Sequence, residues 1–438
     1  MAVKNLVLKN NYLKDVFVAK EVKDLYLFTI NHNTAPIPIR EKFAIPEYNL
    51  KQTVENLKKI KSLDSFLALS TCNRTEIYFI SSNKDKTLTD LYKFFSSFIG
   101  AEEKLVKEYS FILNGQEVVN HYFRLACGLE SLVIGEKQIL SQIKSAYTTA
   151  QEEHILGNTL ERMTQYALKS AKEVHKLTNL STNSPSISSA AVDLANKIAG
   201  PLKTKSVMVL GAGKMAKLAL EQIVKIGGAK ETVALNRSPH RVIEFPDKYK
   251  IDRTVPFDDI YKELNTVDVL ICAAGAPHFI IFAEQFKEYR KDSSKSLHIF
   301  DLSLPRNIDS EFVKLSNVQL IDIDSIQLMY NKATQTNYTD IKNSEEIISK
   351  NIRSFLDSHS SEDISNLIKQ IRERSETIRR LKFEKLSKNK KYFTTEEVDY
   401  ITKNIVNSIL HRPIKLLKKT HPEINYSKVV KEMLDLLL

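Results

Sequence analysis

The stretch SVMVLGAGKMAKLALEQI, residues 206–223, decides the fold of the middle of the chain. Its apolar run VMVL is typical of a buried strand, and the apolar spacing after Gly213 is typical of a helix. Between them Gly211, Gly213 and Ala216 form the pattern G-x-G-x-x-A. A tight turn, an open approach to the backbone and free amides at a helix N-terminus suit a pyrophosphate. The stretch therefore predicts a dinucleotide-binding turn, with a turn that only packs a helix on a sheet as the plainer alternative.

Further apolar runs follow this turn, with helical spacers between most of them. They are TVALN (232–236), VDVLICAAG (267–275), LHIFDLS (297–303) and VQLIDID (318–324). Continuous apolar strands separated by helices indicate a parallel sheet that is covered on both faces. We expect a doubly wound Rossmann domain over residues 179–324, preceded by a polar hinge at 178–189 in which Pro185 starts a new helix.

The second strand of this domain ends in LNRSPHR (235–241), which bears on the choice of cofactor. It offers no Asp or Glu to accept a hydrogen bond from a ribose 2′-hydroxyl. Arg237 and Ser238 offer donors for a 2′-phosphate instead, so NADPH is the expected cofactor, although an exposed arginine at a turn needs no function. The residues expected to bind it are Gly211, Ala212, Gly213, Lys214, Met215, Ala216, Arg237 and Ser238.

The chain before this domain alternates strands and helices. Strands are predicted at 25–31, 65–70, 75–81 and 109–113, and helices at 48–63, 88–100 and 117–126. The order β-α-β-β-α-β is the split βαβ arrangement of ferredoxin-like domains. Residues 138–178 have the spacing of further helices. We expect a catalytic, substrate-binding domain over residues 1–178 in a multidomain α/β protein.

Cys72 lies in the turn between the two strands that have no helix between them. Cysteine is usually buried and inert, but the neighbours Thr71, Asn73 and Arg74 are polar, so nothing apolar in the local sequence covers this thiol. Beside a dinucleotide domain, an exposed thiolate suggests capture of an acyl group followed by reduction with hydride. Arg74 and the amides of the turn would favour the thiolate. A surface thiol without a role is the alternative.

The last part of the chain is predicted to be all helical. Neither proline nor glycine occurs between Pro305 and Pro413, so long helices meet no breaker there. A helical seam is formed by Ile364, Leu367, Ile371, Ile378 and Leu381. We expect a long connecting helix and a dimerisation domain over residues 325–438. The alternative is a helix that packs back on its own chain.

Composition sets outer limits on the function. The formal charge of +11 allows a polyanionic partner such as RNA, although basic runs are more often solvated helix faces. The cysteines number three, an odd count without zinc-site spacing, which suits free thiols in a reducing compartment and argues against a metal site. No apolar run approaches the length of a membrane span. We therefore expect a cytoplasmic protein.

Five segments in order resemble the glutamyl-tRNA reductases. They are NHNTAPIPIREKFAI (31–45), LSTCNRTEIY (69–78), HYFRLACGLESLVIGEKQILSQIKSAY (121–147), GAGKMAKLA (211–219) and DLSLPRNID (301–309). The resemblance implies NADPH-dependent reduction of glutamyl-tRNA to glutamate-1-semialdehyde through a cysteinyl thioester, with release of tRNA. This is the first step of tetrapyrrole (porphyrin, haem) biosynthesis by the five-carbon route. It also implies a homodimer and a complex with glutamate-1-semialdehyde aminomutase.

The resemblance assigns roles to individual residues. Cys72 matches the family's nucleophile and His121 a histidine needed for full activity, which would orient the substrate or donate a proton to the leaving ribose oxygen. Arg74 would grip the glutamyl carboxylate as a planar fork. This chain has Lys137 where the family often has proline. The residues that match substrate positions are Thr71, Asn73, Arg74, Ser131, Glu136, Lys137, Gln138 and Gln142.

Other interpretations of these residues remain open. A satisfied, partly buried histidine is the plainer interpretation of His121, while Cys127 and Cys272 are expected to be structural. A tRNA-independent acyl-thioester reductase would also need Cys72 and the glycine turn. A non-catalytic NADP-sensing protein that binds RNA through its basic helices would not need Cys72.

Overall fold

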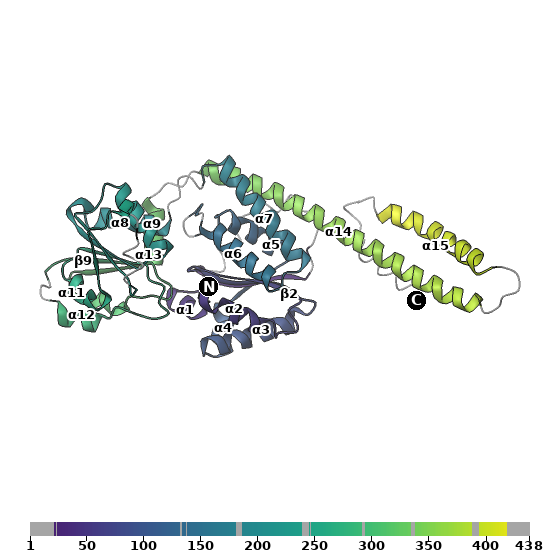
Figure 1. Cartoon of the computed structure of the whole chain (residues 1–438), viewed down its shortest axis with the longest axis horizontal. Helices are drawn as coiled ribbons and strands as arrows, with labels where there is room; N and C mark the ends of the chain where they lie inside the picture. Colours follow the sequence, from purple (N-terminus) through teal and green to yellow (C-terminus); the bar gives the residue numbers. More distant parts are fainter. Residues whose placement is uncertain are drawn as a thin grey trace. The chain divides into compact units, whose positions relative to one another are not determined.

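A computed structural model describes residues 22, 24–131, 134–136, 138–180, 186–238, 245, 247–290, 294–333, 338–387 and 394–417. The chain forms two compact units, one of Asp24–Ile352 and one of Arg353–Leu438 together with Met1–Lys23. The first unit contains two sheets, and each sheet has its own helices (Figure 1). The helices of the second unit are described separately below.

The N-terminal sheet confirms the ferredoxin-like arrangement. It contains β1 (Leu25–Asn31), β2 (Ser65–Ser70), β3 (Arg74–Ile80) and β4 (Phe111–Asn114) in the order β2-β3-β1-β4, and all neighbours are antiparallel. One face is covered by α1 (Ile37–Phe43), α2 (Glu47–Leu57), α3 (Lys84–Ile99) and α4 (Glu103–Tyr109) (Figure 1). The other face is covered by α5 (Gln116–Ala126), α6 (Gln138–Glu152) and α7 (Asn158–Leu177).

Strand periodicity places apolar and polar side chains of this sheet on different faces. Phe28 and Ile77 are cross-strand partners that face the apolar core under α2 and α3. Thr29 and Glu76, the next pair along, face the opposite side because successive side chains alternate. The face towards α5 therefore receives a buried carboxylate.

Two helices of this domain are absent from the sequence prediction. Helix α1 has prolines at its start, which suggest a loop, but proline is compatible with the first turn of a helix because no amide there needs an intrahelical partner. Helix α4 ends at Tyr109, so the strand predicted at 109–113 begins only at Phe111. No helix was predicted at 37–43 or 103–109, and the predicted start of the strand at 109 was wrong, since a short helix leaves little periodic signal.

The second sheet confirms the Rossmann prediction. It contains β5 (Ser206–Leu210), β6 (Glu231–Leu235), β7 (Arg253–Val255), β8 (Val269–Cys272), β9 (Leu297–Asp301) and β10 (Val318–Asp322), all parallel, in the order β10-β9-β8-β5-β6-β7. The three-residue strand β7 was not predicted. The strand order reverses between β5 and β8, which is the point where such sheets bind ligands.

Helices cover both faces of this sheet (Figure 1). One face packs on α8 (Ile187–Ile198), α9 (Lys214–Lys225) and α13 (Ile323–Ala333), and the other on α11 (Ile260–Leu264) and α12 (Ala283–Tyr289). Helix α8 already begins at Ile187, with the Ser186 hydroxyl accepting from the Ser189 amide at 3.1 Å. The predicted hinge is therefore too long at its C-terminal end, and Pro185 lies outside the described residues.

The glycine turn between β5 and α9 depends on Gly211. Its φ is +122°, and a Cβ there would lie 2.5 Å from the Ala273 carbonyl oxygen of the neighbouring strand end. The amide of Gly211 donates to the Leu235 carbonyl at 2.8 Å, which holds the turn against β6. Only glycine combines this backbone conformation with so close an approach.

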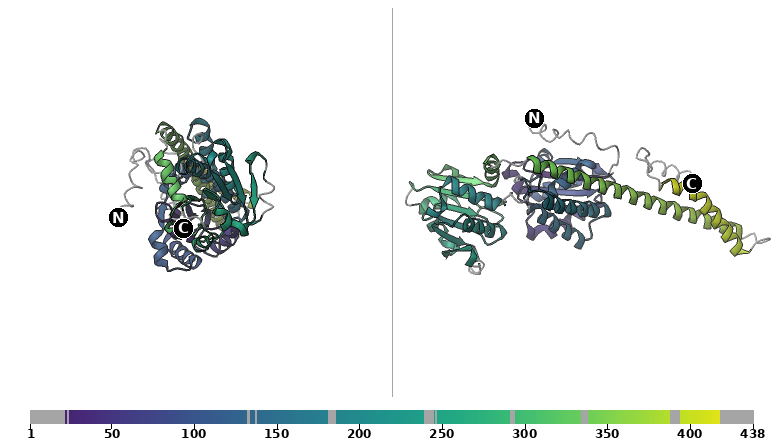
Figure 2. Two further views of the ribbon diagram at one scale, coloured as in Figure 1. Left: turned by 90° about the vertical axis from the view of Figure 1, so that its left-hand side faces the viewer. Right: turned by 90° about the horizontal axis from the view of Figure 1, so that it is seen from above.

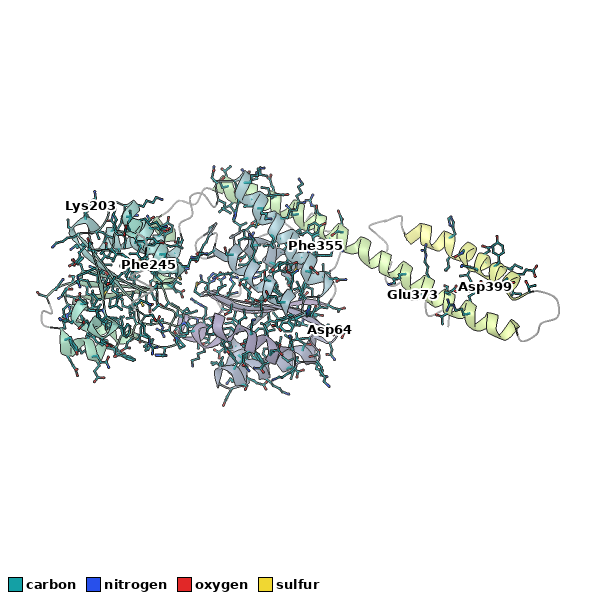
Figure 3. All side chains as sticks on the ribbon, in the orientation of Figure 1. Asp64, Lys203, Phe245, Phe355, Glu373 and Asp399 are labelled. Carbon is teal, nitrogen blue, oxygen red and sulfur yellow. The ribbon has the colours of Figure 1, made fainter. Side chains whose placement is uncertain are left out.

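The second unit consists of helices. Helix α14 (Tyr338–Ser387) begins in the first unit and continues into the second, and α15 (Thr395–Leu417) packs beside its C-terminal part (Figures 1 and 2). The Arg379 guanidinium on α14 bonds Asp399 of α15 at 2.5 Å and the Thr402 hydroxyl at 3.2 Å, and Figure 3 labels Asp399. Helix α15 passes through Pro413, which does not end it.

The helical seam predicted at Ile364, Leu367, Ile371, Ile378 and Leu381 involves side chains outside the described set. It stays a prediction. No helix among the described residues has the length and apolar character to cross a membrane.

Gly211→Ala is expected to lower the free energy of unfolding of the Rossmann domain by about 1–3 kcal/mol through backbone strain alone. Urea unfolding measured by circular dichroism tests this. Gly213→Ala is the matched control, because φ is −80° at Gly213 and a Cβ there meets no atom within 4 Å. Equal stability of wild type and Gly211→Ala would contradict the account of this turn.

Candidate active site

The turn between β2 and β3 holds Cys72, as predicted. The Thr71 amide donates to the Arg74 carbonyl at 2.8 Å, and the Asn73 amide donates to the Thr71 hydroxyl at 3.1 Å. From outside the hairpin, the His32 amide donates to the Asn73 carbonyl at 3.0 Å. These bonds hold the turn from within and from the segment that follows β1.

Cys72 is covered more than its sequence neighbours suggest. The side chain is half-buried and packs against the apolar cluster of the Rossmann domain, which includes Ile37 of α1. The expectation that nothing apolar covers it was therefore wrong, because the covering residues are distant in sequence. Burial, and next the negative charge of Glu136, raise the pKa of the Cys72 thiol to about 12, although Arg40 and Arg74 act in the opposite direction. Burial thus outweighs Arg74, and the raised pKa favours the neutral thiol at neutral pH, a balance that the sequence left open.

Arg74 is buried and its guanidinium already has two partners. Nη1 donates to Glu76 Oε1 at 2.9 Å, and Nη2 donates to the Glu130 carbonyl at 2.5 Å. The side chain is 3% exposed. Its assignment to the substrate carboxylate stays a prediction, and binding there would require one of these bonds to be shared or exchanged.

Glu76 joins several candidate site residues, and sequence reasoning missed it. Its carboxylate is fully buried and accepts hydrogen bonds from Arg74, from Thr29 Oγ1 at 3.2 Å and from the Tyr78 hydroxyl at 2.5 Å. His121 Nε2 of α5 lies 3.0 Å from Oε1. Burial alone would raise the pKa of Glu76, but His121, Arg74 and these hydrogen bonds hold it well below its usual range. The available signal was a carboxylate directly before the apolar run IYFI of a strand, since a charged residue that is buried there must find partners.

Two polar atoms beside the hairpin have no partner among the described residues. They are Asn73 Oδ1 and His32 Nδ1, and both atoms are buried. Burial, followed by the charges of Arg74 and Arg40, lowers the pKa of His32 to about 3, so this imidazole is neutral. Unpartnered buried polar atoms are rare in folded proteins and suit a site that awaits a polar ligand.

The loop before α6 brings Glu136 to the same region. The Gly135 amide donates to the Gly128 carbonyl at 3.0 Å, and both glycines have positive φ. Burial raises the pKa of Glu136 to about 7, against the opposing effects of the Ile187 amide and the Lys214 charge. Ser131 is half-buried in this loop.

Other predicted substrate residues lie nearby or outside the described set. Gln138 begins α6, and Gln142 follows one turn later on the same face, since residues four apart are neighbours on a helix. Thr71 is half-buried in the hairpin turn. Lys137 lies outside the described residues.

The glycine turn of the Rossmann domain fits a dinucleotide. Gly213 is the N-cap of α9 and supplies no capping side chain, and a Cβ there would meet open space. A pyrophosphate can therefore approach the free amides at the start of α9, where Lys214 is exposed, Ala212 and Met215 are half-buried and Ala216 is buried.

The turn after β6 lies at the same edge of the sheet, because β5 and β6 are parallel neighbours. Arg237 is exposed there, and the Asn236 side chain bonds the Ser238 carbonyl at 3.0 Å. This turn and the glycine turn thus border one another at the carboxyl ends of the strands.

Three segments of the chain match known domain families. Residues 28–178 match the N-terminal domain of glutamyl-tRNA(Glu) reductase, residues 193–329 match shikimate/quinate 5-dehydrogenase, and residues 343–436 match the glutamyl-tRNA(Glu) reductase dimerisation domain. The glutamyl-tRNA reductase of Natranaerobius thermophilus is 32% identical, over 90% of this chain and 87% of that protein. The chain belongs to the glutamyl-tRNA reductase family.

Two further relatives agree with this membership. The glutamyl-tRNA reductase of Carboxydothermus hydrogenoformans is 32% identical, over 94% of this chain and 93% of that protein. The solved glutamyl-tRNA reductase from Methanopyrus kandleri has a TM-score of 0.52 at 24% identity, over 93% of this chain and 98% of that one, which shows a shared fold. The glutamyl-tRNA reductase family comprises dehydrogenase-type oxidoreductases, and the middle domain is of the kind that binds a nicotinamide cofactor.

The other two cysteines of this glutamyl-tRNA reductase family member are buried. Cys127 Sγ lies 3.7 Å from the Ser170 hydroxyl, and Cys272 Sγ lies 3.7 Å from the Ser303 hydroxyl. Burial raises the pKa of both thiols. This burial fits the structural role that the sequence predicts for them.

Cys72 in the free protein is expected to react slowly with iodoacetamide at pH 7–8, because its raised pKa leaves little thiolate. The rate should keep rising as the pH increases, with no plateau below about pH 10. Mass spectrometry of the peptide that contains Cys72 measures this, with the urea-unfolded chain as the control for an ordinary thiol. A reaction rate that reaches a plateau near pH 7 would contradict the raised pKa of the Cys72 thiol.

Glu76→Gln is expected to lower the free energy of unfolding by roughly 3 kcal/mol at pH 7, because the buried Arg74 charge loses its counter-charge. The pKa of Glu76 is lower in the folded than in the unfolded chain. Its contribution is therefore complete above the ordinary carboxyl pKa and declines at lower pH, so the gap between wild type and variant should narrow below about pH 4.3.

Urea unfolding at several pH values measures this gap. Glu117→Gln, which removes an exposed carboxylate in the first turn of α5, is the matched control and should lower the free energy of unfolding by less than about 1 kcal/mol. A gap for Glu76→Gln that widens as the pH falls would contradict the assignment of an ionised Glu76.

Proposed function

We propose that this chain reduces glutamyl-tRNA to glutamate-1-semialdehyde with NADPH and releases tRNA, as the first step of tetrapyrrole biosynthesis. The observation that carries the proposal is the thiol of Cys72 in a constrained turn, next to two unpartnered polar atoms and against the cofactor domain. A nucleophile, a polar substrate site and a hydride source thereby belong to one unit of the chain.

In the first half-reaction, the Cys72 sulfur attacks the carbonyl carbon of the ester that joins glutamate to tRNA. The bond from this carbon to the ribose oxygen breaks, and the proton of the thiol ends on that oxygen, so the products are a glutamyl thioester on Cys72 and free tRNA. We assign substrate orientation or this proton delivery to His121, whose ring Glu76 holds in place.

Substrate recognition is assigned to polar side chains around Cys72. Asn73 Oδ1 is free to accept a hydrogen bond from the glutamyl amino group. The Arg74 guanidinium is assigned to the side-chain carboxylate, and the raised pKa of Glu136 lets this residue be present as an uncharged donor near neutral pH. The remaining proposed contacts are Thr71, Ser131, Lys137, Gln138 and Gln142.

For the second half-reaction, residues 211–216 would hold the pyrophosphate of NADPH, and Arg237 and Ser238 would hold its 2′-phosphate. NADPH, when bound, supplies the hydride that is added to the thioester carbonyl carbon. The Cys72 sulfur would then be the leaving group: the carbon–sulfur bond breaks, the thiolate takes a proton from solvent, and the aldehyde departs.

The wider setting of the reaction is also proposed. Functional domains are assigned to residues 1–178, 179–324 and 325–438, with the last as the homodimer contact, in line with its dimerisation-domain match. The reactive aldehyde makes direct transfer to glutamate-1-semialdehyde aminomutase advantageous. Three cysteines without disulfides suit the cytoplasm.

Incubation with tRNA charged with radioactive glutamate, without NADPH, followed by acid quenching tests the proposal. Wild type should carry label and Cys72→Ser none, and NADPH should discharge the label as semialdehyde much faster than NADH does. Label from a free glutamyl thioester without tRNA would favour a tRNA-independent reductase. No label on either protein, with NADPH still bound, would favour a sensing role and overturn the proposal.

A further inference from the structure

Helix α1 carries two adjacent charged residues, Arg40 and Glu41, and each forms an ion pair with the Rossmann domain. Arg40 Nη2 donates to Asp324 Oδ1 at 2.7 Å, and its Nη1 donates to Oδ2 at 3.0 Å. The Arg40 side chain is 2% exposed, whereas that of Asp324 is 31% exposed. Asp324 lies in the first turn of α13, so this two-point contact joins the N-terminal domain to the Rossmann domain.

Glu41 also forms a two-point ion pair, but here α1 supplies the negative charge and the Rossmann domain the positive charge. Arg306 donates from Nη2 to Glu41 Oε1 at 2.8 Å and from Nε to Oε2 at 3.0 Å, and its backbone amide reaches Oε2 at 3.3 Å. The hydrogen bonding of Arg306 to the Glu41 carboxylate is the largest cause of the raised pKa of Arg306. Paired planar contacts fix orientation as well as distance.

An apolar residue completes this face of α1. Ile37 is buried in the cluster that α8, α9 and the sheet of the Rossmann domain form. Ile37, Arg40 and Glu41 are three and four residues apart, so they lie on one side of the helix. One apolar contact and two opposite ion pairs leave the helix little freedom to slide or rotate on the domain.

Helix α1 is also tied to the hairpin that carries Cys72. Before the helix, the His32 amide donates to the Asn73 carbonyl at 3.0 Å. After it, the Thr75 hydroxyl donates to the Phe43 carbonyl at 2.9 Å, and the Ile45 amide donates to the Ser70 hydroxyl at 2.9 Å. A displacement of α1 would therefore move the nucleophile's turn.

Arg306 lies in the loop that follows β9, and several hydrogen bonds hold this loop in place. The buried carboxylate of Asp301 accepts from the amides of Ser303 at 3.0 Å, Asn307 at 3.0 Å and Ile308 at 3.1 Å. The Asn307 side chain donates to the carbonyls of Ala276 at 2.8 Å and His278 at 3.0 Å, in the loop after β8.

These two loops follow β8 and β9, beside the switch point at which a sheet of this kind binds a dinucleotide. The ion pairs of α1 therefore connect the cofactor edge of the Rossmann sheet with the turn of Cys72.

We propose that Glu41 and Arg306, together with Arg40 and Asp324, are positioning residues that align the cofactor domain with the thioester on Cys72 for hydride transfer. This inference rests on the proposed thioester route. A partly exposed ion pair such as Glu41–Arg306 adds little to stability. A displacement of about 1 Å between reacting groups can slow a reaction by about a hundredfold. The two ion pairs should therefore affect the rate of hydride transfer, through the alignment of the two domains, more than they affect stability.

The two half-reactions separate alignment from folding. Glu41→Arg and Arg306→Glu are each expected to form the labelled thioester at the wild-type rate and to bind NADPH with wild-type affinity. The rate at which saturating NADPH discharges the label should fall by about tenfold to a hundredfold. The double variant Glu41→Arg/Arg306→Glu restores an opposite pair and should recover the discharge rate to within about threefold of wild type.

Two further variants complete the design. Asp324→Asn weakens the second pair while leaving Arg40 in place, and it should also slow discharge alone. Arg253→Glu is the matched control, because Arg253 pairs at 2.7 Å with both Glu231 and Glu263 inside the Rossmann domain. Its discharge rate should equal that of wild type.

The outcomes distinguish this inference from the function on which it rests. Unchanged discharge in both single variants, or no recovery in the double variant, would overturn the positioning role. Absence of label on the wild-type protein would instead overturn the thioester route. Loss of label formation in the single variants, with wild type labelled, would mean that the pair supports the N-terminal domain and not alignment.

Discussion

A carboxylate enclosed in the N-terminal domain is the constraint on which the site depends. Removing the charge of Glu76 from water costs several kcal/mol, and only close opposite charges and hydrogen bonds offset this cost. Arg74 and His121 meet that need from β3 and α5. The burial of the Glu76 charge thus determines where Arg74 and His121 lie. Arg74 is also the first residue of β3, directly after the turn that contains Cys72.

The environment of Cys72 suits its proposed role as a nucleophile that stays unreactive until its substrate binds. A covered thiol with a raised pKa resists oxidation and stray alkylation, since the thiolate is the reactive form. Glu136 contributes to this state through its negative charge, and it titrates near neutrality.

The two domains of the first unit are joined through α1 in a way that bears on mechanism. The proposed nucleophile belongs to one domain and the proposed cofactor site to the other, so the proposed reaction requires a reproducible placement of the two domains. Ile37 supplies non-directional attraction, while the two forked ion pairs supply direction. Such pairs of opposite sign on adjacent residues also disfavour a shifted alignment, because a slip would place like charges together.

Local patterns in the sequence determined the glycine turn of Gly211 and Gly213, the two sheet types and the placement of Cys72 in a hairpin turn. The strands, helices and turns arise from residues near each other in the sequence, whose spacing reflects strand and helix periods, and the order of these elements indicates the two sheet types. Only the tertiary structure decided the partners of Glu76, the ion pairs of Arg40 and Glu41 and the covering of Cys72. Arg40 and Asp324 are 284 positions apart, and Glu41 and Arg306 are 265 apart, so no local period marks them. The protonation of a thiol likewise depends on burial and on charges brought from other segments, which packing alone establishes.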